Sequence, residues 1–297
     1  MLNVEGEFLL NVISKLLLGL TSLGVVSMCF AATAVAAPYA TDWIKGHNSR
    51  ARLLVGGAPA PGGTLQRYVA LELALEPGWK TYWRQPGSAG GIPPQLSWQG
   101  SSNLKTAILK FPAPIRMVDS SGVAIGYKKS IVFPIAIEAN APSRPIVVDL
   151  KVFFGVCREI CIPAQAAFKV ALNPNSFMQS PPQLIKALQR VPAVAGHTTK
   201  HSPVLKSVTR SNVGSGRRGL MFDVHFPGGT AGADLFAESG DLLPLAMTKM
   251  VAKPSPDTIR YKVVVDDDGQ WRELGKTGLL LTIVSNAAAS ETRVPRP

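Results

Sequence analysis

Alternation of apolar and polar residues with a period of two runs through much of this 297-residue chain. Residues 131–137 place isoleucine or phenylalanine at every second position, and Ile146 to Phe154 repeats the pattern after a turn. Successive side chains of a strand point to opposite faces, so this period predicts strands with one buried face. The apolar runs are short, and 24 prolines and 27 glycines punctuate the chain. The sequence therefore predicts an all-β protein made of sandwiches, without alternating β-α-β units.

The strand patterns fall into two groups, which predict two β domains. We expect the first sandwich over residues 37–174 and a second, smaller β domain over residues 204–288. Residues 175–203 read as a linker that contains one short helix, Gln183 to Arg190, because three apolar residues share one side of it. Residues 289–297 lose the strand pattern and are expected to form a disordered tail.

The N-terminus predicts export. An almost uncharged apolar segment, Leu16 to Ala37, follows Lys15 and ends in the small residues Ala34-Val35-Ala36-Ala37. This is the pattern of a secretory signal peptide with its cleavage site, which we assign to residues 1–36. The alternative is an uncleaved anchor, but serine and threonine dilute the segment. The expected mature protein is periplasmic.

Charge and motifs exclude several classes of function. The formal net charge is +12 and the pI is near 9.8, but the basic residues are scattered, which disfavours nucleic-acid binding. The charge better suits an acidic partner or an anionic membrane face. Neither a serine-hydrolase elbow, a phosphate loop nor a zinc-protease motif is present. No metal site is predicted: the histidines are dispersed, and Asp266-Asp267-Asp268-Gly269 predicts a hairpin turn because the other calcium ligands are missing.

Cys157 and Cys161 are the only cysteines outside the predicted signal peptide. Four residues of extended strand span roughly 13 Å, whereas the Cα atoms of a disulfide lie within about 7 Å. The pair must therefore flank a turn, and the strand patterns on both sides favour the end of a hairpin. A bond that closes so short a loop stabilises the fold by only about 2 kcal/mol through chain entropy. From these residues alone, redox exchange, a structural disulfide and metal binding all remain open.

Four motifs in a fixed order carry a resemblance to a known family. They are Gly78–Gly87 (GWKTYWRQPG), Phe111–Pro114 (FPAP), Gly126-Tyr127 through Phe133-Pro134, and Val156–Pro163 (VCREICIP). Their order and spacing resemble the N-terminal periplasmic domain of the thiol:disulfide interchange protein DsbD family, in its copper-tolerance-associated branch, over roughly residues 65 to 172. The resemblance implies an immunoglobulin-like sandwich. It also implies that Cys161 forms the mixed disulfide with a partner and that Cys157 resolves it.

The same resemblance suggests further site residues. A cap that shields the cysteine pair would fall within Met117 to Tyr127, where Asp119 and Tyr127 are the candidates for the surroundings of the active site. Three aromatic residues are candidates for a groove that binds the partner, although aromatic residues of β domains more often belong to the core. These are Trp79, Tyr82 and Trp83.

The resemblance predicts a thiol–disulfide exchange protein that needs no cofactor besides its own Cys157–Cys161 disulfide. It would pass electrons to a periplasmic thioredoxin-like or disulfide-isomerase-like partner. Because neither the membrane domain nor the thioredoxin-like domain of full-length relatives follows before Pro297, we expect a separate membrane protein to donate the electrons. Whether the chain is a protein-disulfide reductase in the enzymatic sense stays open. The alternatives are a Cu(I)-binding or copper-tolerance accessory module, since thiolates suit Cu(I), and a β domain with a structural disulfide.

Overall fold

A computed structural model of the chain describes residues 39–60, 63–120, 122–212, 218–239, 245–265 and 268–295. All of them belong to one compact unit, Ala37–Pro297. The predicted signal peptide lies outside the described residues. Within these ranges, no helix has the length and apolar character needed to cross a membrane.

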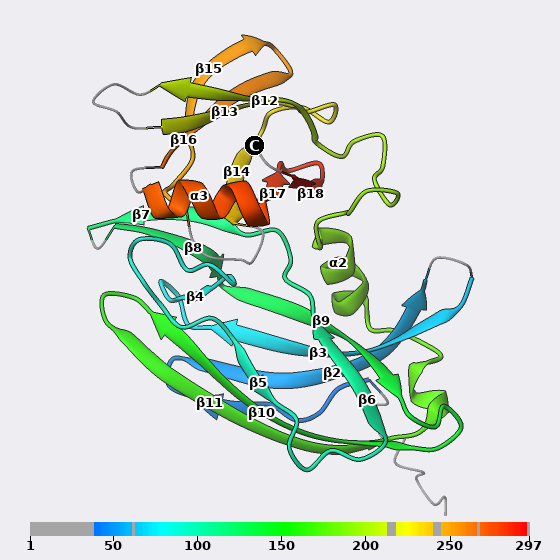
Figure 1. Cartoon of the computed structure of the whole chain (residues 1–297). Coiled ribbons are helices and arrows are strands. Elements are labelled where there is room, and N and C mark those ends of the chain that lie inside the picture. Colours follow the sequence, from blue (N-terminus) through cyan, green and yellow to red (C-terminus); the bar gives the residue numbers. More distant parts are fainter. Residues whose placement is uncertain are drawn as a thin grey trace, which may run out of the picture. The chain divides into compact units, whose positions relative to one another are not determined.

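Two antiparallel sheets form the first module (Figure 1). One sheet has the order β1 (Ile44–Gly46), β2 (Ser49–Pro59), β3 (Leu65–Leu75), β9 (Ser130–Ala139) and β6 (Leu104–Leu109). The other has the order β11 (Cys161–Leu172), β10 (Ile146–Cys157), β4 (Lys80–Tyr82), β8 (Gly122–Lys128) and β7 (Ile115–Asp119), and β5 (Gln95–Ser97) pairs with β10. The alternating apolar residues of both sheets meet in one core, which includes Leu53, Leu71, Phe133, Ile135, Leu150 and Phe154. The predicted immunoglobulin-like sandwich is confirmed.

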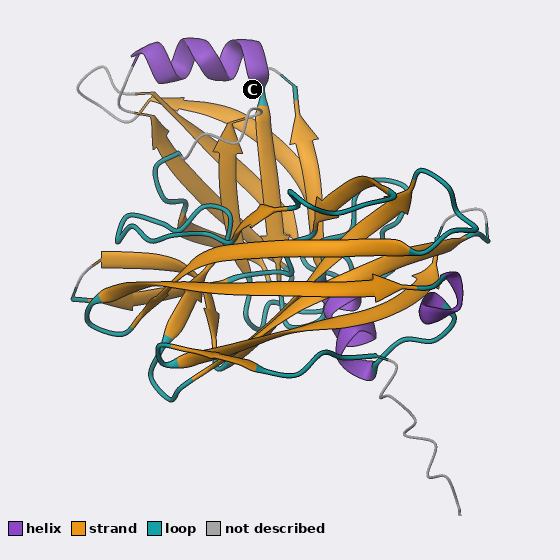
Figure 2. Ribbon diagram, turned by 90° about the horizontal axis from the view of Figure 1, so that it is seen from below, coloured by secondary structure: helices purple, strands orange, loops and turns teal. Residues whose placement is uncertain are grey.

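The second module is also a pair of antiparallel sheets, as predicted. One has the order β12 (Val204–Asn212), β13 (Arg218–His225), β16 (Thr258–Val265) and β15 (Lys249–Ser255). The other has the order β14 (Asp234–Ser239), β17 (Leu279–Val284) and β18 (Ala289–Val294). Its core is separate from that of the first module and includes Leu220, Phe222, Tyr261, Val263 and Leu281. Figure 2 shows that strands dominate both modules, with only short helices beside them.

Two predictions for the second module are wrong. The expected disordered tail contains β18, which pairs with β17 from Leu279↔Val294 to Val284↔Ala289. The expected hairpin turn after Val265 is replaced by α3 (Asp268–Thr277), although Asp266 and Asp267 lie outside the described residues. Trp271 and Leu274 lie three positions apart on α3 and both pack against the second core. Two apolar residues were too few to indicate a helical period.

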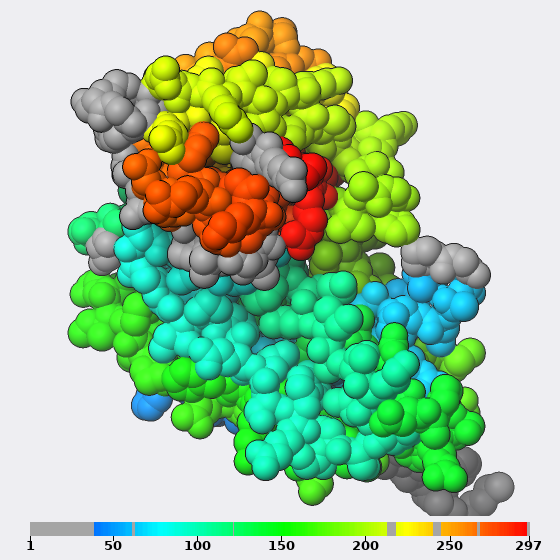
Figure 3. All heavy atoms as spheres, in the orientation of Figure 1, coloured from blue at the N-terminus to red at the C-terminus, as the bar shows by residue number. Residues whose placement is uncertain are grey.

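The segment between the modules is packed against the first sandwich. It contains a short 3-10 helix, η1 (Pro174–Phe177), and α2 (Pro182–Arg190), which confirms the predicted helix. Leu184 on α2 is fully buried against Leu54 and Ala70 of the first module. Farther along, Ala193 bridges to Ser290 of β18, and in Figure 3 the red C-terminal residues lie beside the green connecting segment.

The sheet of β14, β17 and β18 is covered on both faces. Leu235 packs into the second core, whereas the next residue, Phe236, packs against the first module, with its ring centroid 5.5 Å from that of Trp83. All six residues of β17 are buried. Of the polar residues of β18, Ser290 is buried and Glu291 forms an ion pair with Arg84 of the first module. This explains why the strand carries no alternation that sequence reasoning could detect.

Candidate active site at the β10–β11 hairpin

The two cysteines close the long β10–β11 hairpin. The strands pair without a register shift from Ile146↔Leu172 to Cys157↔Cys161, and Arg158, Glu159 and Ile160 form the loop between the cysteines. Their Cα atoms are 4.2 Å apart and their sulfurs are joined in a disulfide. This confirms the predicted hairpin end. A continuous ladder of twelve residue pairs holds the disulfide in place at the end of the sandwich.

The two sulfurs have very different surroundings. Cys157 is 1% exposed, because β10 lies between β11 and β4 in the sheet. Its side chain packs with Tyr82, Met117 and Ala124. Cys161 is exposed, because β11 is the edge strand. An incoming reagent can therefore reach Cys161 and not Cys157.

Tyr82 contacts the exposed cysteine. Its hydroxyl lies 3.1 Å from the Sγ atom of Cys161, although the residue as a whole is 1% exposed. Burial raises the pKa of Tyr82, and the charge of Asp119 raises it further. The phenol therefore stays protonated at neutral pH and can donate a hydrogen bond to sulfur.

A glycine lets the chain cross over this tyrosine. Gly91 has a φ of +140°, and a Cβ atom there would lie 2.4 Å from the Tyr82 ring. Nearby, the amide of Gly155 donates to the carbonyl of Ile92 (2.8 Å), and the amide of Ile125 donates to that of Pro86 (2.8 Å). The segment from Pro86 to Ile92 therefore covers the ring and leaves the hydroxyl at the disulfide.

Lys80 and Asp119 form an ion pair beside the buried cysteine. Lys80 on β4 is the cross-strand partner of Cys157, so both side chains lie on the same face of the sheet. Its ammonium group bonds the carboxylate of Asp119 at the end of β7, and Lys80 is 7% exposed. Asp119, predicted to surround the active site, thus lies within electrostatic reach of Tyr82.

Two other predicted site residues belong to the core instead. Tyr127 follows Ala124 by three positions on β8, so it points to the opposite face, packs edge-on against Phe133 (5.3 Å) and donates to the carbonyl of Pro112 (2.7 Å). Trp83 follows Tyr82 directly and is fully buried for the same reason. The structure thus places Tyr127 and Trp83 in the first core, whereas Tyr82 and Ala124 pack with Cys157. Trp79 is half-buried and packs against the first core.

Sequence reasoning missed the roles of Lys80 and Tyr82 beside the sulfurs. The available signal was their spacing: residues two apart on a strand share a face. What the sequence did not contain was the pairing of β4 with β10, which brings that face to Cys157.

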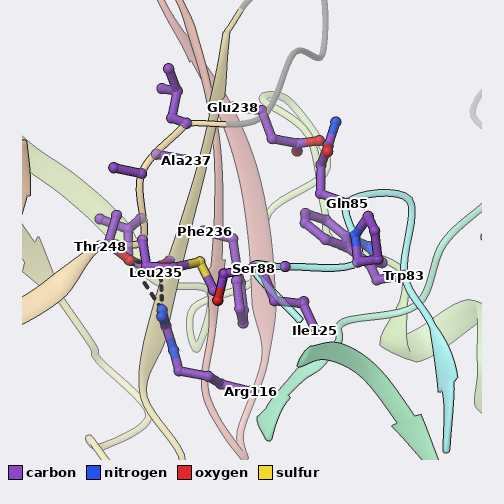
Figure 4. A pocket seen from close by; sticks show the side chains of 15 residues that line it. Trp83, Gln85, Ser88, Arg116, Ile125, Leu235, Phe236, Ala237, Glu238 and Thr248 are labelled. Atoms are coloured by element: carbon purple, nitrogen blue, oxygen red, sulfur yellow. Dashed lines mark hydrogen bonds between the residues drawn. The ribbon is translucent and has the colours of Figure 1, made fainter. Parts of the chain in front are cut away.

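A separate cavity of about 360 Å³ lies between the modules (Figure 4). Its walls are mainly apolar and include Trp83, Ile125, Leu235 and Phe236. Arg116 reaches it from β7 and is held by Asp234 and by the Thr248 hydroxyl (3.1 Å). Neither cysteine lines this cavity. Among the described residues, no group of three or more histidine, cysteine, aspartate or glutamate side chains is placed to hold a metal ion.

Comparison with a solved structure supports the fold. The N-terminal periplasmic domain of ScsB from Proteus mirabilis has a TM-score of 0.60 at 19% identity, covering 87% of this chain and 99% of its own. An alignment with bovine butyrophilin covers 82% of this chain and 98% of its own at 14% identity, but the TM-score of 0.22 is too low to indicate a shared fold. A search of curated proteins found no match. Residues 63–173, which contain both cysteines and Tyr82, match the family "Thiol:disulfide interchange protein DsbD, N-terminal", and they form a thiol–disulfide interchange module of this type.

Proposed function

We propose that this chain is a periplasmic thiol–disulfide exchange protein. It receives electrons from a membrane-bound donor and passes them to disulfides of thioredoxin-like or disulfide-isomerase-like partners. The observation that carries the proposal is the asymmetry of the pair, with an exposed Cys161 and a buried Cys157 in one disulfide. A nucleophile needs access, whereas a resolving thiol needs only to reach the first sulfur.

The exchange transfers two electrons in two substitutions at sulfur. In the reduced protein, the Cys161 thiolate attacks one sulfur of the partner disulfide, which forms a mixed disulfide and breaks the partner's own bond. Cys157 then attacks the Cys161 sulfur, restores the Cys157–Cys161 bond and releases the second partner thiol. The protons of the two cysteine thiols end on the partner's two sulfurs. The hairpin ladder keeps both sulfurs close enough for the second step.

The redox potential of the pair tests this proposal. After equilibration with a series of glutathione buffers, we expect the bond to exchange, with a potential above about −300 mV, because structural disulfides of secreted proteins typically lie below that value. Alkylation of free thiols followed by mass measurement gives the reduced fraction. Cys161→Ala, which cannot form the bond, is the control that should show no such transition. A bond that stays closed in every glutathione buffer would assign the pair a structural role.

Replacement of Tyr82 by phenylalanine should slow the first step. The variant loses the hydroxyl that donates to Cys161, and a hydrogen bond to a charged group contributes about 1.5–3 kcal/mol. In a Cys157→Ala background, we expect alkylation of Cys161 to shift to higher pH by about one unit and to slow roughly tenfold at pH 7. Tyr68→Phe, in β3 and away from the disulfide, is the matched control. An unchanged pH profile would remove Tyr82 from the mechanism.

A further inference from the structure

A polar groove of about 870 Å³ lies beside the disulfide hairpin. Its walls are the turn between β1 and β2, the turn between β3 and β4, and Arg158. We call it the hairpin groove and define it by Lys45, Arg50, Glu76, Trp79 and Arg158. Arg158 belongs both to this groove and to the loop between the two cysteines. A chain segment that lies in the groove is therefore held next to the redox pair.

The groove carries excess positive charge. Lys45, Arg50 and Arg158 are exposed and face one acidic residue, Glu76. In the part of the chain that the structure describes, none of these three cations is bound in an ion pair to a carboxylate. Cations that are not neutralised by a carboxylate of the same chain attract and orient an anionic partner.

Two of the groove cations lie against neighbouring groups. The guanidinium of Arg50 lies 4.5 Å from the centre of the Trp43 ring, in cation–π geometry. Arg158 lies against the turn at Gly78, where φ is +87° and a Cβ atom would be 3.5 Å from the Arg158 Nε atom. The stacking of Arg50 on Trp43 reduces the side-chain freedom that Arg50 loses when a ligand binds.

We propose that the hairpin groove binds an acidic, extended segment of the redox partner that lies close to the partner's disulfide. The groove then selects acidic partners and presents their disulfide to Cys161. This inference rests on the proposed exchange function and adds the chemistry of the partner's docking segment. Electron transfer itself follows the two substitutions described above.

Matched peptide disulfides test the groove without a known partner. Three peptides share one disulfide-closed sequence and differ only in the residues that flank it, which are glutamate, lysine or glutamine. We expect the fully reduced protein to reduce the acidic peptide faster than the basic one, on the order of tenfold at low ionic strength. The ratio should fall as salt is added, since the screening length is about 10 Å at 0.1 M. Stopped-flow measurement of the rates gives the ratio directly.

Charge-reversal variants test whether the preference for the acidic peptide arises from the hairpin groove. Arg50→Glu with Arg158→Glu should abolish or invert the ratio of acidic to basic rates, and Arg50→Gln with Arg158→Gln should reduce it in a less perturbed protein. The control is Lys200→Glu with Lys253→Glu, which makes the same change in net charge at exposed sites in the connecting segment and on β15. We expect the control to keep most of the wild-type ratio.

The outcomes separate this inference from the function on which it rests. A ratio of acidic to basic reduction rates near one in the wild type would contradict the docking proposal. So would a ratio that stays unchanged in both groove variants. Neither result would contradict the exchange function. Failure to reduce even the neutral peptide overturns the exchange function, and the docking proposal with it.

Discussion

Replacement of Cys157 by alanine should trap the protein in a stable mixed disulfide with its partner, whereas replacement of Cys161 should abolish exchange. Cys161 is the exposed sulfur and carries the first attack, so the Cys157→Ala variant completes that step but cannot resolve it. In Cys161→Ala, the remaining thiol lies under Tyr82, Met117 and Ala124 and cannot reach a partner. Incubation of each reduced variant with a peptide disulfide, followed by non-reducing mass analysis, distinguishes the two results.

The two variants control for each other. Both lose the same disulfide, which closes a loop of only three residues between the cysteines, so each should be destabilised by only about 2 kcal/mol and remain folded. Thermal melting should therefore give nearly the same midpoint for both, while their adducts differ completely. Equal adduct formation by the two variants would contradict the assignment of roles, and an adduct found only in Cys161→Ala would reverse it.

The features predicted best from the sequence are those that depend only on residues close together in the chain, such as single strands and the hairpin end. The period-two runs identified β10 and β11, and the impossibility of bridging four residues along a strand placed the cysteines at a hairpin end. The identity of the exposed sulfur was implied only by family resemblance. In the structure it follows from sheet order, because β11 is an edge strand and β10 is not.

Residues whose position depends on strand pairing could not be placed from the sequence. Tyr82 and Trp83 are adjacent aromatic residues in the same motif, yet one contacts Cys161 and the other is fully buried in the core. Tyr127 was suggested by its place in a motif, but strand alternation turns it away from the disulfide. The face on which each side chain lies depends on which strand pairs with which, and short strands such as β4 do not carry that information in their composition.

The junction between the modules contains a buried charge cluster that no sequence pattern indicated. Arg84 donates to both carboxylate oxygens of Glu238, with a shortest distance of 2.6 Å, and also to Glu291 (2.7 Å) and Thr282 (3.0 Å). Its guanidinium lies 4.3 Å from the centre of the Trp83 ring. Glu238 is 1% exposed. These contacts join the first module to β14, β17 and β18, although the residues lie far apart in the chain.

Replacement of Arg84 by leucine should destabilise the protein by about 3–5 kcal/mol, because it leaves the Glu238 carboxylate buried without its cation. For a chain of this size, that corresponds to a fall in the thermal midpoint of roughly 10 °C. The control is Lys105→Leu, which breaks an exposed ion pair with Glu138 (3.4 Å) and should cost no more than about 1 kcal/mol. Equal melting of the two variants would show that the junction does not depend on the buried pair.

The pH dependence of the stability lost in Arg84→Leu tests whether Glu238 is the source of that loss. Burial raises the pKa of Glu238, and the hydrogen bonds from Arg84 oppose that rise, so removal of Arg84 raises the pKa further. A carboxyl whose pKa is higher in the folded than in the unfolded state, where it is about 4.3, costs stability above the folded pKa. That cost is relieved as the pH falls through the folded value. The loss of stability in Arg84→Leu should therefore shrink as the pH falls from 7 toward the unfolded-state pKa of about 4.3. Adding Glu238→Gln should remove this rescue by acid and recover part of the stability at pH 7. A deficit that stays constant with pH in Arg84→Leu would place the lost stability elsewhere, in the contact of Arg84 with Trp83 or with Glu291.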